Sequence, residues 1–327
     1  MAYDQFTLPI GRPAAPVPPP SAATLALADG PDAVTITGPA FTVLFDKASG
    51  TMTSLKYRGT ELVHQPLMPD FWRAWTDNDR GARLQTRLNV WRIASESWDA
   101  KAVTATRAAD GSVRVEVEAA IPAISSPYRV AYTVFPTGDI YVDASFAPGI
   151  DTLPMLPRFG MRMAMPAGFE RVAWFGPGPE ETYADRNEAR VGRHSGTVDG
   201  QWTEYSKPQE NGNKEDVRWL AVTNAKGVGL LAVGMPHLGA AVRHFTHEDI
   251  WNAKHAYELT RRPETHLNLD FAQMGVGGDD SWGALAHEPY QLPAKAYSYR
   301  FRLRPYSTAI DGTPEALAKK APMAPGR

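Results

Sequence analysis

Apolar and polar residues alternate along most of this 327-residue chain. Residues 113–118 read Val-Arg-Val-Glu-Val-Glu, so that every second side chain is apolar. A period of two places the apolar side chains on one face of an extended strand and the polar side chains on the other. The pattern predicts half-buried β-strands here and in residues 33–37, 41–45, 128–135, 140–146, 218–223, 229–234 and 297–303.

Short turn sequences join several of these strands. Residues 136–139, Pro-Thr-Gly-Asp, connect two alternating runs, and residues 224–227 connect two others, so each pair predicts a hairpin. Nowhere do apolar residues keep a helical period over three or more turns. With 28 prolines and 27 glycines among short strands, we expect an all-β fold, a large sandwich of antiparallel strands.

The two ends of the chain differ in composition from the middle. Residues 1–22 contain five prolines between positions 11 and 20, and proline fixes φ and donates no backbone hydrogen bond. We therefore expect a Pro-rich linker over residues 1–22 and one β-domain over residues 23–306. Residues 307–327, rich in Ala, Pro and Lys, predict a solvated tail with a short helix at 314–320.

Composition excludes several classes of partner. The net charge is −2, so no basic field is present to hold nucleic acid or an anionic membrane surface. No apolar run approaches the roughly 20 residues that span a bilayer. No signal peptide is visible and cysteine is absent, which removes disulfides and thiolate metal sites and favours a cytoplasmic protein.

Two polar segments in the first part of the chain carry candidate chemistry. In residues 71–81, aromatic rings stand beside Asp77, Asn78 and Asp79, which suits sugar binding, although a capped turn uses the same residues. In residues 174–186, Glu180 and Glu181 resemble a glycosidase acid pair. Neighbouring residues of a strand point to opposite faces, so a Gly-Pro-rich loop ending in ion pairs is the better interpretation.

Two further polar segments follow. In residues 205–213, Glu210 and Asn211 could line a sugar cleft together with Arg218, or form a turn with an internal Glu–Arg pair. Residues 274–282, Met-Gly-Val-Gly-Gly-Asp-Asp-Ser-Trp, form a glycine-rich loop that presents Trp282. Such a ring is a platform for a sugar or a lid over the core.

Histidines and serines give weaker signals. His244 and His247 stand three residues apart without a third ligand at a recognisable spacing, which is a weak zinc pattern. No Gly-x-Ser-x-Gly elbow occurs, so the sequence does not support a serine hydrolase.

The four polar segments occur in the order found in the last domain of the large family-2 bacterial β-galactosidases. That domain contains elements that resemble residues 71–81, the Gly-x-Gly-Pro-x-Glu-x-Tyr-x-Asp-Arg of residues 176–186, and the Pro-x-Glu-Asn-Gly of residues 208–212. Its Met-Gly-x-Gly-Gly-Asp-Asp-Ser-Trp element matches residues 274–282 at every fixed position. The resemblance covers roughly residues 24–305.

This resemblance implies a fold and a role. The fold would be a β-supersandwich similar to aldose mutarotases. Trp282 would reach into the active site and bind the aglycone or acceptor sugar, and Gly81 would begin a mobile loop that extends to about Leu88. Arg80, Arg83 and Leu84 depart from relatives in that loop, so only Gly81 and Trp282 are carried over.

The resemblance also implies what lies elsewhere. The nucleophile and acid/base glutamates, with the residues that hold magnesium and sodium, belong to a preceding barrel domain, so no cofactor is expected on this chain. We therefore expect a β-galactosidase small subunit or fragment that is inactive alone. Its partners would be the large chain or preceding domains and a galactoside such as lactose.

Two other functions stay open at this stage. One is a stand-alone carbohydrate-binding module. The other is a mutarotase or epimerase acting on free sugars, which needs one acid and one base near the anomeric centre. His255, His237 and Glu210 are its first candidates.

The chain is rich in large aromatic residues, with nine tryptophans and twelve phenylalanines. Several tryptophans fall in polar segments. We predict an exposed aromatic patch near Trp282 and residues 71–91 where a barrel domain would dock, the alternative being that these rings fill the core. The tryptophans concerned are Trp72, Trp75, Trp91, Trp98 and Trp251.

Overall fold

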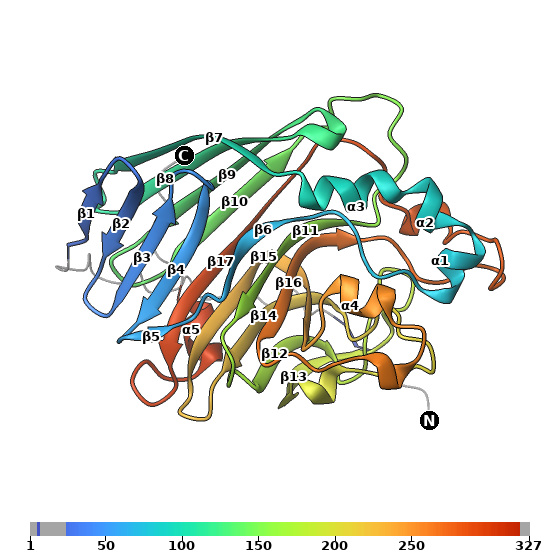
Figure 1. The fold of residues 1–327 in the computed structure, drawn as a ribbon. Coiled ribbons are helices and arrows are strands. Elements are labelled where there is room, and N and C mark those ends of the chain that lie inside the picture. The colour runs from blue at the N-terminus through green and yellow to red at the C-terminus, as the bar shows by residue number, and fades with distance from the viewer. Residues whose placement is uncertain (1–4, 7–23, 321–327) are drawn as a thin grey trace.

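The computed structural model describes residues 5–6 and 24–320. The Pro-rich linker expected over residues 1–22 lies outside the described residues, apart from Gln5 and Phe6. Seventeen strands and five short α-helices form the described chain, so the all-β prediction is confirmed (Figure 1). No helix in this part of the chain is both long and apolar enough to span a bilayer.

The strands are β1 (Ala26–Asp29), β2 (Ala33–Thr37), β3 (Phe41–Asp46), β4 (Thr51–Tyr57), β5 (Thr60–Glu61), β6 (Gln65–Asp70), β7 (Asp99–Arg107), β8 (Val113–Ile121), β9 (Ser126–Val134), β10 (Ile140–Phe146), β11 (Arg158–Met165), β12 (Arg171–Gly178), β13 (Arg190–Thr197), β14 (Lys214–Thr223), β15 (Val228–Arg243), β16 (Thr265–Gln273) and β17 (Tyr297–Ser307). The α-helices are α1 (Asp77–Gly81), α2 (Leu84–Arg87), α3 (Asn89–Glu96), α4 (His247–Asn252) and α5 (Pro314–Lys319).

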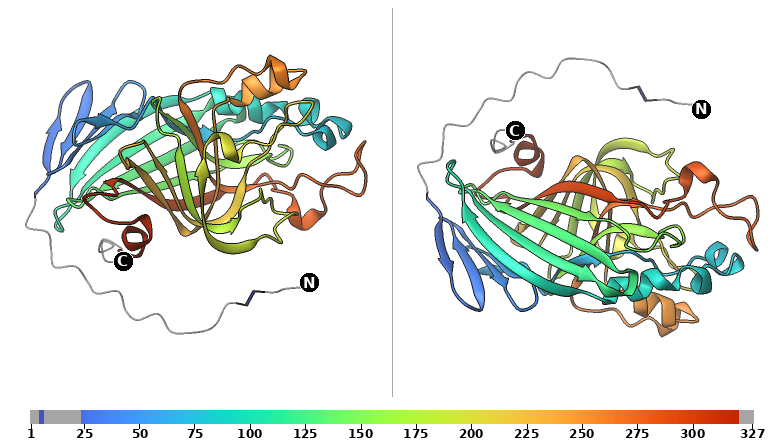
Figure 2. Two further views of the ribbon diagram at one scale, coloured as in Figure 1. Left: turned by 90° about the horizontal axis from the view of Figure 1, so that it is seen from below. Right: turned by 90° about the horizontal axis from the view of Figure 1, so that it is seen from above.

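Two antiparallel sheets pack face to face. A small sheet has the order β1-β2-β3-β4-β5, and a large sheet runs β13-β12-β14-β15-β17-β10-β9-β8-β7. β16, β11 and β6 form a branch of the large sheet that leaves from β15. The large sheet curls round, and its edge strands at β12 and β13 lie far from those at β7 and β8 (Figures 1 and 2).

The alternating sequence pattern explains how the sheets pack. In β8, Val113, Val115 and Val117 are buried while Glu116 and Glu118 are exposed, as the sequence predicts. The small sheet buries its own apolar face against β8, β9 and β10, where the Phe45 and Tyr132 rings lie 4.9 Å apart. Both predicted hairpins, β9–β10 and β14–β15, are present.

Three short helices that the sequence pattern did not reveal lie between β6 and β7. Thr76 caps α1 by a reciprocal capping box with Asp79, which also pairs with Arg73. Each helix is too short to show an apolar stripe of three turns, and the segment therefore resembles a polar loop in sequence. These helices cover one end of the sandwich (Figure 1).

The aromatic patch predicted near Trp282 and residues 71–91 is wrong for residues 71–91, although Trp282 itself is exposed. Trp72, Trp75 and Trp91 are fully buried, and the Phe71 and Trp91 rings lie 5.9 Å apart in the core. Trp98 and Trp251 are partly buried against the same core. The segment folds back over the open end of the sandwich, so its rings fill that end instead of facing a partner.

Most of residues 308–320 are exposed or half-buried, as expected of the solvated tail predicted from residue 307, but part of this segment packs on the domain. Ser307 ends β17 and is buried, and the predicted helix is present as α5. Leu317 of α5 packs beside Trp219 and Tyr306, and Arg302 donates hydrogen bonds to the Leu317 and Ala318 carbonyls. Residues 321–327 lie outside the described residues.

Candidate functional site

Trp282 is 78% exposed and belongs to the loop between β16 and β17, residues 274–296, which is called the Trp282 loop below. The loop tip is held by Asp280, whose Oδ1 atom accepts hydrogen bonds from the backbone N–H groups of Trp282, Gly283 and Ala284, each at 2.9 Å. The Ala284 and Trp282 N–H groups lower the pKa of Asp280, so the carboxylate is ionised at neutral pH. The ring is thus presented to solvent on a fixed backbone.

The segment 71–81 holds the base of the Trp282 loop. Arg73 is fully buried and donates to the carbonyl oxygens of Met274, at 2.7 Å, and Gly275, at 2.8 Å. Asn78 donates to the Val276 carbonyl at 2.9 Å. Asn78 thus binds the backbone of the Trp282 loop directly, whereas Asp79 acts through Arg73, which it pairs with.

The structure explains glycine at position 81 by close packing against the Trp282 loop, whereas the sequence analysis expected glycine there as a hinge. A Cβ atom at Gly81 would stand 2.6 Å from the Ser281 carbonyl oxygen and 2.7 Å from the Trp282 Cα atom. Close approach of two backbones therefore requires glycine at this position. The left-handed residue of the segment is Arg83, with φ of 57°. Movement of the loop from Gly81 to Leu88 stays a prediction.

The second polar segment, residues 174–186, covers the end of β12 and most of the connection to β13, and it binds both the Trp282 loop and the third polar segment, residues 205–213. Asp185 accepts hydrogen bonds from the Val276 and Gly277 N–H groups at 3.0 and 2.7 Å. Glu181 accepts one from the Gly212 N–H at 2.7 Å and forms an ion pair with Arg186. Glu180 is exposed. The predicted loop is therefore confirmed for residues 179–186, with one ion pair, whereas residues 174–178 belong to strand β12.

The third polar segment, residues 205–213, closes a ring of contacts among the four polar segments. Gln209 accepts a hydrogen bond from the Asp77 N–H at 2.9 Å, which joins this segment to residues 71–81. Asn211 holds its own turn, since it accepts the Thr203 N–H and donates to the Gln209 carbonyl. All four sequence motifs thus meet around the Trp282 loop, at one end of the sandwich.

Glu210 and Arg218 do not form the predicted pair. Arg218 donates to the Asp216 carbonyl at the surface, whereas Glu210 turns into the interior and is 3% exposed. There it pairs with Arg158 at 3.4 Å and Arg243 at 3.5 Å. The extended backbone of β14 carries Arg218 away from the turn that holds Glu210.

Glu210 belongs to a buried charge cluster behind the site. Arg158 is its centre and lies 3.1 Å from Asp70 and 3.2 Å from Asp270. Burial opposes ionisation of Glu210, but Arg243 and Arg158 outweigh it and lower its pKa. Burial raises the pKa of Asp270 well above its usual range despite the attraction of Arg158. The cluster therefore shifts the pKa values of its carboxyl groups in opposite directions.

We expect the stability of the chain to depend on pH through Glu215, beside this cluster. Burial raises its pKa to about 7 from an ordinary value of 4.5, so the folded state holds a proton that the unfolded state has released between these values. The free energy of unfolding should therefore fall as pH rises from about 4.5 to 7, by on the order of 2 kcal/mol.

Denaturant titrations at several pH values would measure this dependence. Glu215→Gln removes the titrating proton and should flatten this part of the profile, whereas Glu116→Gln on the solvent face of β8 should leave the slope unchanged. An equal slope in both variants would contradict the assignment to Glu215.

The zinc pattern and the mutarotase candidates do not converge. His247 contacts Asp70 at 2.9 Å inside the buried cluster, while His244 contacts Glu170 at 2.9 Å near the surface. Glu170, His244 and Asp199 approach each other, but the Arg261 guanidinium contacts all three and supplies the positive charge. His237 pairs with Asp216 and His255 stacks on Tyr257, each apart from the buried Glu210.

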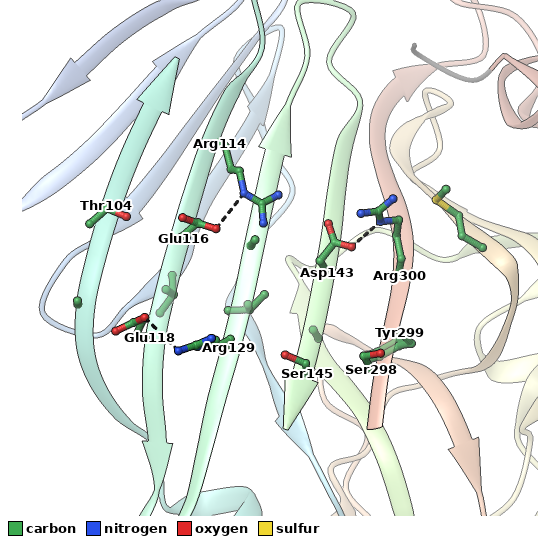
Figure 3. A pocket seen from close by; sticks show the side chains of 16 residues that line it. Thr104, Arg114, Glu116, Glu118, Arg129, Asp143, Ser145, Ser298, Tyr299 and Arg300 are labelled. Atoms are coloured by element: carbon green, nitrogen blue, oxygen red, sulfur yellow. Dashed lines mark hydrogen bonds and ion pairs between the residues drawn. The ribbon is translucent and has the colours of Figure 1, made fainter. Parts of the chain in front are cut away.

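A broad hollow of about 1160 Å³ lies on the outer face of β7, β8, β9, β10 and β17. Six charged side chains rise from this face and pair with one another: Arg114 with Glu116, Arg129 with Glu118, and Arg300 with Asp143 (Figure 3). Small residues such as Ala131 and Ser145 form its floor, and its one aromatic lining residue, Tyr299, is 9% exposed. A balanced, solvated sheet face without an open ring is a weaker sugar site than the Trp282 loop.

The chain matches the family model described as β-galactosidase small chain over residues 37–303, most of its length. The chain belongs to this family. Among curated proteins, it is 38% identical over 93% of its length to the β-galactosidase of Priestia megaterium, and 34% identical over 88% to that of Streptococcus thermophilus. It spans 29% and 28% of the length of these β-galactosidases.

Solved structures whose backbones align with this chain include two proteins from Lactobacillus acidophilus. A galactose mutarotase related enzyme aligns with 84% of this chain and 98% of its own, with a TM-score of 0.45 and 10% identity. A galactose 1-epimerase aligns with 87% of this chain and 98% of its own, with a TM-score of 0.46 and 8% identity.

Proposed function

We propose that this small-chain domain completes the active site of a β-galactosidase that hydrolyses terminal β-D-galactosides such as lactose. Trp282 would supply the stacking surface for the aglycone or acceptor sugar. The exposed ring on a braced loop carries this proposal, because burying an aromatic ring against a pyranose face is favourable and a backbone that is already held loses little entropy on binding.

The catalytic glutamates, and the magnesium and sodium sites, belong in this proposal to the larger part of the enzyme, on another domain or chain in the cytoplasm. Retaining hydrolysis requires two carboxyl groups about 5–5.5 Å apart on either side of an accessible bond. The carboxyl groups that gather in the described residues, Asp70, Glu210 and Asp270, surround the Arg158 guanidinium and are buried. They stabilise the domain rather than face a substrate.

Reconstitution tests the proposal. The chain alone should not cleave a nitrophenyl β-galactoside, and mixing it with a β-galactosidase truncated before its small-chain domain should restore cleavage. In that assembly Trp282→Ala should weaken use of glucose as an acceptor by about 1–3 kcal/mol, the value of one stacked ring, and leave folding intact.

Two results would contradict the proposal. One is turnover by the isolated chain that a carboxylate substitution within it abolishes. The other is sugar binding by the isolated chain with no effect on the truncated enzyme, which is the behaviour of a stand-alone carbohydrate-binding module.

A further inference from the structure

The Trp282 loop is unusual because its ring is free and its backbone is fastened in several places. No ring stacking and no cation contact involves the Trp282 ring in the part of the chain that the structure describes. The backbone from Met274 to Ala284, in contrast, gives hydrogen bonds to or accepts them from Arg73, Asn78, Asp185 and Asp280.

Asp185 differs from the other three residues in its position. Arg73 and Asn78 belong to the segment that α1 fixes, and Asp280 lies inside the loop itself. Asp185 comes from the separate connection between β12 and β13 and bridges to the point where the loop leaves β16. Each of its two carboxylate oxygens accepts one backbone N–H, from Val276 and from Gly277.

The contact between Asp185 and the loop is also shaped by glycine. A Cβ atom at Gly275 would stand 2.5 Å from the Asp185 Oδ2 atom, so the backbone there approaches the carboxylate closely. Among the described residues Asp185 forms no ion pair within 4.0 Å, and the neighbouring Arg186 pairs with Glu181 instead. The hydrogen bonds of the Asp185 carboxylate are therefore directed at the loop.

We propose that Asp185 is a positioning residue for Trp282, which sets the direction of the loop before a sugar or the rest of the enzyme is bound. A carboxylate that accepts two adjacent N–H groups forms strong hydrogen bonds and orders the backbone on both sides of Gly277. Because the loop is then already ordered in the free chain, the entropy cost of ordering it does not weaken binding. The part of this inference that concerns sugars rests on the proposed function.

Hydrogen exchange of the isolated chain tests the positioning directly. Asp185→Asn leaves one oxygen and places an NH₂ group against a backbone N–H, so exchange in the peptide spanning residues 274–284 should become about tenfold faster. Asp151→Asn removes a carboxylate from an exposed turn and is the matched control. Equal exchange of this peptide in the two variants would overturn the proposal.

A double-mutant cycle in the reconstituted enzyme tests whether Asp185 acts through Trp282. Asp185→Asn should raise the glucose concentration needed for half-maximal transfer roughly fivefold, with kcat for hydrolysis changed less than about twofold. In the Trp282→Ala background the same substitution should add nothing. An equal effect in both backgrounds would assign Asp185 a general structural role and overturn the proposal.

The two experiments separate this inference from the proposed function. Faster exchange in Asp185→Asn, together with unaltered acceptor use in Trp282→Ala, would retain the positioning of the loop and refute the role of the ring in the enzyme. Unaltered exchange, with impaired acceptor use in Trp282→Ala, would retain the proposed function and refute the positioning.

Discussion

Arg158→Met should destabilise the chain by about 3–5 kcal/mol. Arg158 is fully buried and lies within 3.4 Å of Asp70, Glu210 and Asp270, so its removal leaves buried carboxyl groups without their central cation. Methionine preserves most of the volume, which restricts the loss to charge and hydrogen bonding. Urea unfolding followed by circular dichroism would measure the change in the free energy of unfolding.

Arg129→Met is the control for Arg158→Met. Its guanidinium pairs with Glu118 at 3.6 Å on the solvent face, and such pairs contribute about 1 kcal/mol or less. If the two variants unfolded at the same urea concentration, the buried cluster would not have the stabilising role that its geometry indicates.

Trp91→Ala should lower the free energy of unfolding by about 3–5 kcal/mol, because it leaves a large cavity in a closely packed core. The Trp91 ring packs near Phe71 and Phe146, and its Nε1 atom donates to the Pro154 carbonyl at 3.1 Å. Removal of the ring would also leave that carbonyl without this donor. Thermal unfolding would show the loss as a lower transition temperature.

Trp282→Ala gives the contrasting result for a ring in solvent. It should change the free energy of unfolding by less than about 0.5 kcal/mol, as expected of an exposed side chain. Equal stability losses in Trp91→Ala and Trp282→Ala would mean that the burial of one of the two rings is misassigned.

The sequence predicts the strands well and the ends of the sandwich poorly. Alternation in β8 reflects one face in water and one in the core, and this local rule requires no knowledge of distant partners. Residues 71–96 fold against parts of the chain about 200 residues away, such as Arg73 on Gly275. No local pattern reports that contact, so the buried rings of this segment resembled an exposed patch.

The candidate site was predictable to a similar extent. Trp282 and Gly81 follow from the resemblance, but the reason for Gly81 is visible only from the Trp282 backbone beside it. Asp185, Arg73 and Asp280 lie inside the recognised motifs without any sign of their separate roles. The burial of Arg158 and Asp270 could not be predicted, because the sequence shows only a charged residue within an apolar strand. The same pattern occurs where the charged residue faces solvent.

Strand β15 joins the main run of the large sheet to its branch of β16, β11 and β6, and this limits how the sequence can vary. Residues 228–235 pair with β17 and residues 239–243 pair with β16, while β14 pairs along the other edge. An inserted or deleted residue in its middle would shift one register relative to the other and move side chains to the wrong face of a sheet. Natural length variation should therefore accumulate in the hairpin turns. A circular permutation that places the new termini within β15 should abolish folding, whereas one that places them in the turn at residues 224–227 should be tolerated.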